Sequence, residues 1–489
     1  MRNELRRRTF LKLLALASAN VLTGCANRAA STSAADATNA EGNGRDVVVL
    51  GGGLAGLCAA YELRQRGFHV VAILEAQKRI GGRVFTQRVG HTGGQYAELG
   101  ATRIADTHTF TLKYCQQFGI GLSNFPTGDG LYHVRGKTFR HHDGDAWPDF
   151  FNLAPADRKK SPDEIVLSYE NLTELGDPTR SDWPTGKALE YDAMSICDYL
   201  KSKGANDDVL IIDRAINGSE VDVDAALYWL MADVVDAKWD KTCKMTKGND
   251  QLSEAFAASL GDVVKRECIV TRMDQQPGHV TIGYQQNGIA RDVRASLVVC
   301  SLPFSTLRHI DLSKANFSAD KLRVIADMHY IPISRANVQT KTRFWKEMGL
   351  GGLKVARTDT QLERFWDMTL VQDGQQGILT SYMMDKNALT FAALAPSARL
   401  DWVKQRAQPF FPELASQAEN ATYKIWQDDP WVRGGWGYYQ KGEARNFPIA
   451  KRREGRVFFC GEHTSPWTGW MQGAFESANR VLAEITNGA

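Results

Sequence analysis

A glycine-rich turn between an apolar run and a helix-like segment constrains the fold more than any other feature of this chain. The run Asp46–Leu50 leads into GGGLAG at residues 51–56, which contains the pattern GxGxxG. Helix-like residues follow, and then a second apolar run that ends at Glu75, 19 residues after Gly56. In such a unit the glycines permit a tight turn, the approach of backbone to a pyrophosphate, and close packing of helix on strand. The stretch predicts an α/β fold with a dinucleotide-binding unit.

This unit also predicts which groups contact the dinucleotide. Unpaired N–H groups at the start of the helix suit phosphate oxygens, and Glu75 is expected to accept hydrogen bonds from the ribose hydroxyls. The pattern by itself does not distinguish NAD from FAD. The predicted contacts from this segment are Gly51, Gly53, Leu54, Ala55, Gly56, Glu75 and Ala76.

Three further segments, taken in order with the first, resemble the flavin amine oxidases, the superfamily of monoamine oxidases and L-amino-acid oxidases. They are RIGGRV at residues 79–84, GDVVKRECIV at 261–270, and GRVFFCGEHTS with TGWMQGA at 455–474. The resemblance covers nearly all of residues 45–489 and implies FAD as the cofactor. Trp436 stands where some members carry a cysteine bonded to flavin, so the FAD is expected to be non-covalent. The cofactor contacts implied by the resemblance are Gly82, Arg83, Gly100, Ala101, Thr102, Arg103, Val264, Glu462, Gly469, Trp470, Met471, Gln472 and Ala474.

The resemblance also implies the domain organisation. A Rossmann-type FAD-binding domain is expected from three segments, 45–105, 245–310 and 446–489. Residues 106–244 are expected to form a helical substrate or cap domain, and residues 311–445 an α+β substrate-binding domain. Helix-like stretches occur at 109–118, 196–203, 221–235 and 396–410, and strand-like runs at 331–340 and 376–383.

Arg103 is the residue that bears on the substrate. Gly100-Ala101-Thr102-Arg103 resembles the Gly-x-x-Arg of L-amino-acid oxidases, where the arginine binds the substrate α-carboxylate through two charge-assisted hydrogen bonds. Tyr382 matches a tyrosine that donates to the same carboxylate in that group, and Gly469 and Trp470 are expected to orient the α-amino group. A salt-bridged structural role is the alternative for Arg103.

Another position argues against an amine-specific enzyme. Amine-specific members surround the flavin with two aromatic side chains, of which Trp470 matches one. Gly437 stands where the tyrosine of that pair belongs, so the pair is expected to be incomplete. His108 is expected to be a buried structural histidine, and Trp426, Trp431 and Trp436 are expected to belong to the core rather than to a cofactor site.

The reaction implied is hydride transfer from the substrate Cα to flavin N5, with Trp470 and Arg335 as catalytic residues. Hydrolysis of the resulting imino acid then gives a 2-oxo acid and ammonia, and reoxidation of the reduced flavin by O2 gives hydrogen peroxide. Arg335 stands where the family usually has a lysine that assists the reaction with oxygen, and arginine is a poor proton donor. A quinone is therefore the alternative electron acceptor. The alternative functions are an amine or polyamine oxidase, a tryptophan 2-monooxygenase-like enzyme, and a non-catalytic FAD protein. The chain is also compatible with a homodimer.

The N-terminal residues predict export. RRRTFLK, the short apolar run to Leu22 and the ending LTGC are typical of a twin-arginine signal with a lipobox over residues 1–25. Cys25 is then expected to carry a lipid that anchors the protein at a membrane, with 26–44 as a polar tether; ordinary cleavage is the alternative. The twin-arginine machinery becomes a partner, and a periplasmic or cell-surface location follows.

The net charge and the cysteines exclude other classes of partner. Residues 1–24 hold five basic residues and one acid, so the net charge of +3 becomes −1 without them, and nucleic acid is not an expected partner. The other seven cysteines lack CxxC spacing, so neither disulfides nor a metal site is expected.

Overall fold

The computed structural model describes residues 45–126, 130–218, 223–236, 241–350 and 355–488. They belong to one compact unit, residues 42–489. The predicted export signal, Cys25 and the tether lie outside the described residues.

A parallel sheet of five strands, in the order β10-β2-β1-β14-β23, forms the centre of the half that contains the predicted dinucleotide-binding unit. Its strands come from stretches far apart in the sequence. They are rich in valine, and most of their apolar side chains are buried because helices and a second sheet cover both faces. The confirmed α/β fold thus assembles one sheet from three parts of the chain. The strands are β1 (Asp46–Leu50), β2 (His69–Leu74), β10 (Val264–Lys265), β14 (Leu297–Cys300) and β23 (Val457–Phe459).

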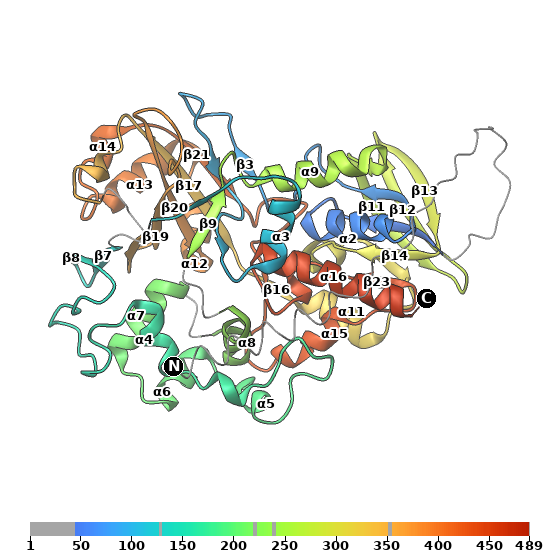
Figure 1. Ribbon diagram of the computed structural model, residues 1–489, viewed down its shortest axis with the longest axis horizontal. Coiled ribbons are helices and arrows are strands. Elements are labelled where there is room, and N and C mark those ends of the chain that lie inside the picture. Colours follow the sequence, from blue (N-terminus) through green and yellow to red (C-terminus); the bar gives the residue numbers. More distant parts are fainter. Residues whose placement is uncertain (1–44, 127–129, 219–222, 237–240, 351–354, 489) are drawn as a thin grey trace, which may run out of the picture. The chain divides into compact units, whose positions relative to one another are not determined.

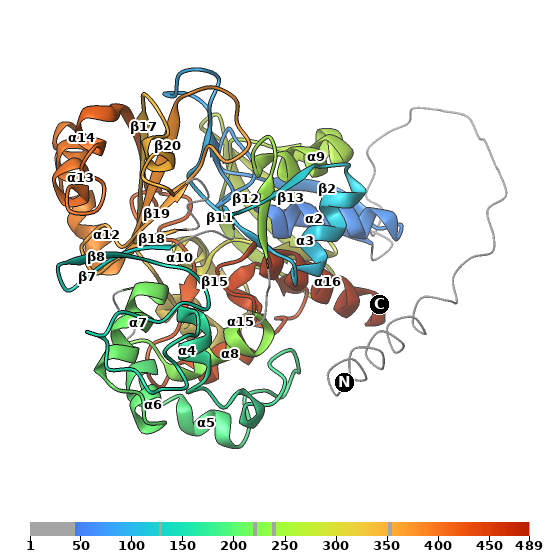
Figure 2. The same ribbon diagram turned by 60° about the vertical axis from the view of Figure 1, so that its left-hand side comes forward.

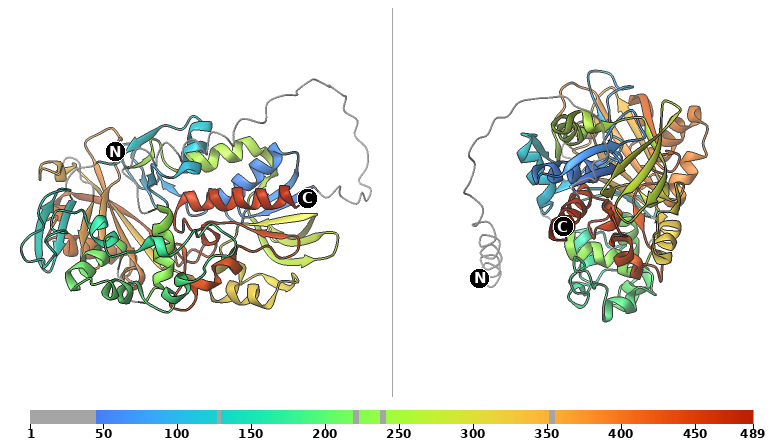
Figure 3. Two further views of the ribbon diagram at one scale, coloured as in Figure 1. Left: turned by 60° about the horizontal axis from the view of Figure 1, so that its bottom comes forward. Right: turned by 90° about the vertical axis from the view of Figure 1, so that its right-hand side faces the viewer.

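Helices α2 (Leu54–Gln65), α9 (Asp250–Leu260) and α16 (Met471–Asn487) pack together beside this sheet (Figure 1). Figure 3 shows the C-terminal helix α16, in red, lying along α2, in blue. Phe475, Val481 and Leu482 of α16 join Leu57 and Leu63 of α2 in one apolar cluster. A four-stranded sheet continues the same half of the molecule, formed by β11 (Cys268–Gln275), β12 (Val280–Gln286), β13 (Ile289–Ala295) and β15 (Asp311–Lys314).

A second large sheet has seven strands in the order β21-β17-β20-β19-β18-β7-β8. All its neighbouring strands are antiparallel except β18 and β7. Apolar residues of one face, such as Val338 and Leu379, pack against α12 (Asp385–Ala392), α13 (Arg399–Ala407) and α14 (Leu414–Gln417), which cover that face (Figure 2). The strands are β7 (Gly130–Val134), β8 (Lys137–His141), β17 (Ile333–Thr340), β18 (Ala356–Thr358), β19 (Arg364–Asp367), β20 (Gly377–Met384) and β21 (Ala418–Ile425).

A group of short helices packs beside that sheet (Figure 2). Its apolar core includes Tyr199, Leu210, Leu227 and Leu230. The helices are α4 (Pro162–Leu167), α5 (Lys187–Tyr191), α6 (Ile196–Ser202), α7 (Asp207–Asn217) and α8 (Ala226–Asp236). The remaining principal elements are α3 (Thr109–Gln117), α10 (Phe304–Leu307), α11 (Ala319–Asp327), α15 (Phe447–Lys451), β3 (Thr86–Gln87), β4 (Ala97–Glu98), β5 (Ile104–Ala105), β6 (Leu122–Asn124), β9 (Thr242–Met245), β16 (His329–Tyr330) and β22 (Gly437–Tyr438).

The local predictions agree with these elements within a few residues. The helices expected at 109–118 and 196–203 are α3 and α6, and the strand expected at 331–340 is β17, which begins after Pro332 because proline cannot donate to the ladder. The domain boundaries at 106, 245, 311 and 446 stay a prediction. The hairpin of β7 and β8, from segment 106–244, extends the sheet that segment 311–445 forms.

The described residues contain neither a helix long and apolar enough to cross a bilayer nor a group of His, Cys, Asp or Glu side chains that could hold a metal ion. The seven cysteines they contain are buried free thiols.

Candidate functional site

A cavity of about 410 Å³ lies between the parallel sheet and the seven-stranded sheet. At one side it is lined by residues that follow the carboxyl ends of parallel strands, namely Glu75, Ser301 and Gly461. At the other side it is lined by Arg335 of β17 and Tyr382 of β20. The carboxyl edge of a parallel sheet is where open α/β folds bind their ligands, so the predicted nucleotide site lies at this side, and the seven-stranded sheet forms the opposite wall.

The glycine-rich turn opens this cavity at the start of α2. A Cβ placed on Gly53 meets no atom within 4 Å, whereas one on Gly56 lies 2.2 Å from the carbonyl oxygen of Gly51. Gly51 has a φ of +97°, which favours glycine. Gly53 therefore exposes bare backbone to the cavity, while Gly51 and Gly56 shape the turn without lining it.

Glu75 lies at the same end and is 6% exposed. Its Oε2 accepts from the backbone N–H of Gly52 at 2.8 Å and its Oε1 from that of Gln77 at 2.8 Å. Burial raises the pKa of Glu75. The carboxylate is thus held at the cavity wall, beside Ala76, by backbone donors.

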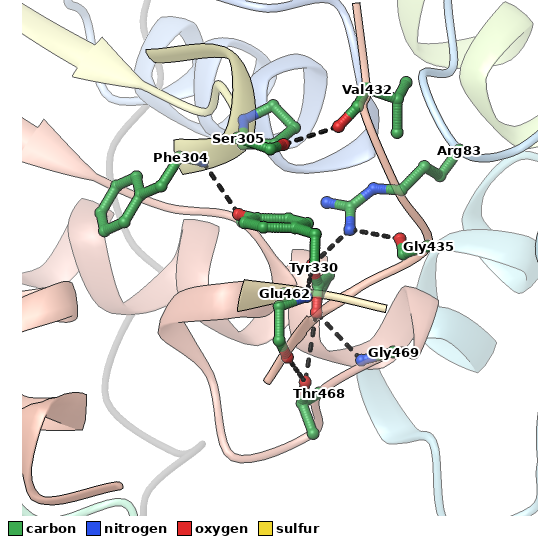
Figure 4. A network of polar contacts seen from close by, with 12 residues as sticks. Arg83, Phe304, Ser305, Tyr330, Val432, Gly435, Glu462, Thr468 and Gly469 are labelled. Carbon is green, nitrogen blue, oxygen red and sulfur yellow. Dashed lines mark hydrogen bonds and ion pairs between the residues drawn. The ribbon is translucent and has the colours of Figure 1, made fainter. Parts of the chain in front are cut away.

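A polar network anchors the loop that precedes α16 (Figure 4). Nη1 of Arg83 donates to the carbonyl of Gly435 at 2.8 Å and to Oε1 of Glu462. Oε2 of Glu462 accepts from the N–H of Gly469 at 3.0 Å and from Oγ1 of Thr468 at 3.3 Å. Burial acts to raise the pKa of Glu462, but Arg83 and these hydrogen bonds more than offset it, so the pKa is lowered. The carboxylate thereby fixes Gly469 at the cavity wall.

The start of α16 faces the cavity through Trp470, Met471 and Ala474. No side chain caps this helix terminus, and its positive end would favour negative charge on a bound ring. Gln472 is turned away from the cavity, because its Oε1 accepts from the N–H groups of Phe110 and Thr111, each at 3.1 Å.

Arg103 lies beside Trp470 at this end of the cavity. Its guanidinium carbon is 5.8 Å from the ring centroid of Trp470 and 5.3 Å from that of Trp366. Burial, together with repulsion from Arg364 and Arg357, lowers the pKa of Arg103 to about 10. Arg103 is therefore a partly buried cation among aromatic rings, still charged at neutral pH. It flanks the cavity rather than lining it.

Tyr382 lies on the cavity wall, parallel to Trp436 with centroids 6.5 Å apart and 7° between the rings. Burial raises the pKa of Tyr382, so its hydroxyl is a neutral donor. Beside it, Nη1 of Arg335 donates to the carbonyl of Glu98 at 3.0 Å and to Oγ1 of Thr102 at 2.7 Å. The hydroxyl of Thr102 is therefore hydrogen-bonded to Arg335, and Thr102 does not line the cavity, whereas Gly100 and Ala101 do.

The residues that line the cavity differ in part from those predicted from the sequence. Val264 is not among the described residues that line the cavity, whereas Cys268 to Thr271, a few positions further on, are. The expectation that Trp431 and Trp436 belong only to the core is wrong, since both line the cavity, and Trp426 does so too while buried. Their five-residue interval matches no regular secondary structure, and the loop after β21 brings them to the site.

His108 is fully buried, as predicted. Its Nδ1 accepts from the N–H of Ala105, so Nε2 carries the proton and lies 3.2 Å from Oδ1 of Asp236. Its ring is 4.8 Å from that of Trp470. The buried histidine thus packs edge-on against the ring of Trp470 and helps to fix its position.

Comparison with known proteins identifies the class. The sequence profile of the flavin-containing amine oxidoreductases matches residues 54–486, so the chain belongs to this family. The predicted resemblance is confirmed, and the family implies a flavin cofactor. The residues present fit one: open glycine backbone and an uncapped α2 terminus lie beside Glu75 at one end, and the uncapped start of α16 lies at the other.

The chain is similar over most of its length to curated relatives. It is 28% identical to the flavin-dependent L-tryptophan oxidase RebO of Lentzea aerocolonigenes, over 91% of this chain and 98% of that protein. It is also 28% identical to the L-amino-acid oxidase of Siganus canaliculatus, over 90% of this chain and 85% of that protein.

Two solved structures share the fold. Cyclohexylamine oxidase from Brevibacterium oxydans has a TM-score of 0.77 at 22% identity and matches 91% of this chain and 99% of its own. Putrescine oxidase bound to putrescine has a TM-score of 0.76 at 20% identity, with the same coverage of both chains. At these identities the likeness concerns the fold alone.

Proposed function

We propose that the protein is an FAD-dependent L-amino-acid oxidase, which converts an L-amino acid to the 2-oxo acid with release of ammonia, and that it holds FAD non-covalently. The observation that carries this proposal is the position of Arg103 beside Trp470, with Tyr382 on the adjoining wall. A guanidinium and a phenol are donors that suit a carboxylate.

The side chains here bind and orient the substrate. Arg103 holds the α-carboxylate, and the neutral hydroxyl of Tyr382 donates to it. The N–H of Gly469 is engaged by Glu462, which leaves the Gly469 carbonyl to accept from the substrate amine. When bound, the flavin accepts the hydride equivalent from Cα, and the protein's main contribution is to fix Cα in position.

Amine oxidation is the second candidate, because Tyr382 and Trp436 are parallel aromatic walls and Trp470 is a third. Such walls suit an uncharged amine. The two candidates differ in whether the substrate needs its carboxylate, and this difference defines the experiment.

The test compares each L-amino acid with its decarboxylated amine by following flavin bleaching without oxygen. We expect bleaching by amino acids only. Arg103→Ala should raise the dissociation constant of the amino acid about 10-fold to 100-fold, the equivalent of one lost charged hydrogen bond, with a smaller effect on the limiting rate. Arg291→Ala, at an exposed position of β13, is the matched control. Equal bleaching by the amines would reject the carboxylate clamp.

We also propose export by the twin-arginine pathway, with a lipid on Cys25 that places the enzyme at a membrane, and O2 or a quinone as electron acceptor. Cys25→Ser should move the protein from the detergent phase to the aqueous phase in a detergent-partition experiment. An unchanged distribution would contradict the anchor. Steady-state assays in air and with a soluble quinone distinguish the acceptors.

A further inference from the structure

The segment between β4 and β5, residues 99–103, carries Arg103 at its end and lines the cavity through Gly100 and Ala101. Its residues belong to neither strand, so regular sheet pairing ends before them. Because backbone carbonyls away from water need hydrogen-bond donors, the groups that donate to this segment determine how Arg103 is presented to the cavity.

Asn249 supplies the donor for the two carbonyls that precede Arg103. Its Nδ2 donates to the carbonyl oxygen of Ala101 and to that of Thr102, each at 2.9 Å. The Thr102 carbonyl belongs to the peptide bond that joins Thr102 to Arg103. The amide group of Asn249 therefore holds the backbone directly at the arginine.

The side chain of Asn249 is itself fixed in one orientation. The residue is fully buried, its Oδ1 accepts from the N–H of Met245 at 3.0 Å, and its own N–H donates to Oε1 of Glu98 at 3.0 Å. An amide oxygen accepts and an amide nitrogen donates, so rotating this amide by half a turn would set its oxygen against two carbonyls. The donor group thus faces the segment.

The position of Asn249 in the sequence would favour a different role. Asn249 directly precedes α9, and asparagine is common there because its side-chain oxygen accepts from N–H groups of the first turn. The side chain of Asn249 makes no such bond to α9. It is turned back toward the segment that carries Arg103 instead, so its hydrogen bonds serve the segment rather than the helix.

Neighbouring carbonyls are held by residues of the cavity wall. Nη1 of Arg335 donates to the carbonyl of Glu98 at 3.0 Å, and Nε1 of Trp426 donates to that of Leu99 at 2.8 Å. Both donors line the cavity, whereas Asn249 is not among the described residues that do. A neutral substitution of Asn249 therefore acts on a bound ligand through the segment, without changing the wall itself.

We propose that Asn249 is a positioning residue of this site, which holds the carbonyls of Ala101 and Thr102 so that Arg103 is directed toward the substrate carboxylate. This inference rests on the proposed function and adds to it a residue that contacts the arginine's backbone rather than the substrate. Without the amide, both carbonyls lose their donor, and the peptide group at Arg103 is no longer fixed.

The experiment measures the binding of butyrate and of butyramide to the holoenzyme through the change in the flavin spectrum. Butyrate offers a carboxylate but no amine to oxidise, and butyramide is its neutral counterpart. We expect the wild type to bind butyrate more tightly. Asn249→Ala and Asn249→Asp should each raise the dissociation constant of butyrate about tenfold and change that of butyramide much less. The first variant adds no charge and the second leaves no space, so agreement between them excludes both side effects.

Gln275 provides the matched control. It is 7% exposed, its Nε2 donates to the carbonyl of Ala315 at 2.7 Å, and its Oε1 accepts from the N–H of Arg456 at 2.6 Å. It is not among the described residues that line the cavity. Gln275→Ala and Gln275→Glu remove a similar buried amide, so they should lower stability but leave the preference for butyrate over butyramide unchanged.

The outcomes separate this inference from the proposed function. If both Asn249 variants keep the preference for butyrate while Arg103→Ala loses it, the positioning role is rejected and an L-amino-acid oxidase remains. If the wild type does not prefer butyrate, the carboxylate clamp and the proposed function fail. Loss of flavin from both Asn249 variants, but not from the Gln275 variants, would assign Asn249 to folding and overturn the inference.

Discussion

Arg335 on β17 and Tyr382 on β20 face each other across an antiparallel ladder, and the guanidinium carbon of Arg335 lies 4.6 Å from the centroid of the tyrosine ring. Nη1 of the same guanidinium donates to the carbonyl of Glu98 and to Oγ1 of Thr102. Arg335 is thus fixed by contacts to three residues at the cavity wall, where the family resemblance places a lysine.

Arg335→Lys is expected to increase the rate constant for reaction of reduced flavin with O2 by about tenfold or more. An ammonium group can donate a proton through a bound water, a form of acid catalysis that a guanidinium does not supply. The measurement is stopped-flow reoxidation at several O2 concentrations. Arg335→Gln, which lacks the charge, should show no such gain. An unchanged rate constant for the lysine variant would assign Arg335 to structure alone.

Gly53→Ala and Gly56→Ala should affect different properties, flavin binding and stability respectively. The alanine at 53 meets no protein atom, so the free energy of unfolding of the apoprotein should change little while flavin binding weakens. The alanine at 56 would press on the Gly51 carbonyl, so the free energy of unfolding should fall by about 1–3 kcal/mol or more. Denaturant unfolding and fluorescence titration with FAD measure the two effects. Equal loss of stability in both variants would contradict this assignment.

The dinucleotide-binding unit could be predicted because its signals are local. The strand, the glycine turn, the helix and Glu75 lie within 30 residues, from Asp46 to Glu75, and each follows from its own neighbours. The start of α16 could be predicted for the same reason, because its signal is the continuous stretch TGWMQGA at 468–474. Local signals do not predict where the side chain of Gln472 points. The residue lies at this helix terminus, but its Oε1 accepts hydrogen bonds from the backbone of α3.

The alignment of Arg335, Tyr382, Arg364 and Arg357 on one face of the seven-stranded sheet could not be predicted, because it depends on strand register. Arg335, Arg357, Arg364 and Tyr382 lie on four strands, and only the pairing of those strands shows that they share a face. A shift of one residue in any ladder would turn a side chain to the opposite side. The sequence contains these residues without any periodicity that relates them.

Glu462→Gln is expected to reduce both stability and flavin retention. The change leaves Arg83, whose side chain is 22% exposed, without its anion and weakens the support of Gly469. Breaking such a largely buried pair costs about 3 kcal/mol or more of unfolding free energy. Denaturant unfolding and the ratio of flavin to protein absorbance measure these effects.

Arg272→Gln is the control for that variant. It breaks the pair with Asp292, whose two side chains are 41% and 54% exposed, and should cost less than about 1 kcal/mol. A loss in Glu462→Gln no larger than in this control would show that the network in Figure 4 contributes little.

Glu98 should make the stability of the protein depend on pH. It is fully buried, its carboxylate accepts from the N–H of Asn249 at 3.0 Å and from Oγ1 of Thr86 at 2.9 Å, and burial raises its pKa from 4.5 to about 7. Between these two values the folded state binds more protons at this group than the unfolded state does. The free energy of unfolding therefore falls as the pH rises from about 4.5 to about 7, by up to about 3 kcal/mol. Glu98→Gln cannot ionise, so its stability relative to the wild type should increase over this window and be highest above pH 7. Denaturant unfolding of both proteins at pH 5 and pH 8 measures the difference, and parallel pH profiles would show that Glu98 does not titrate in this range.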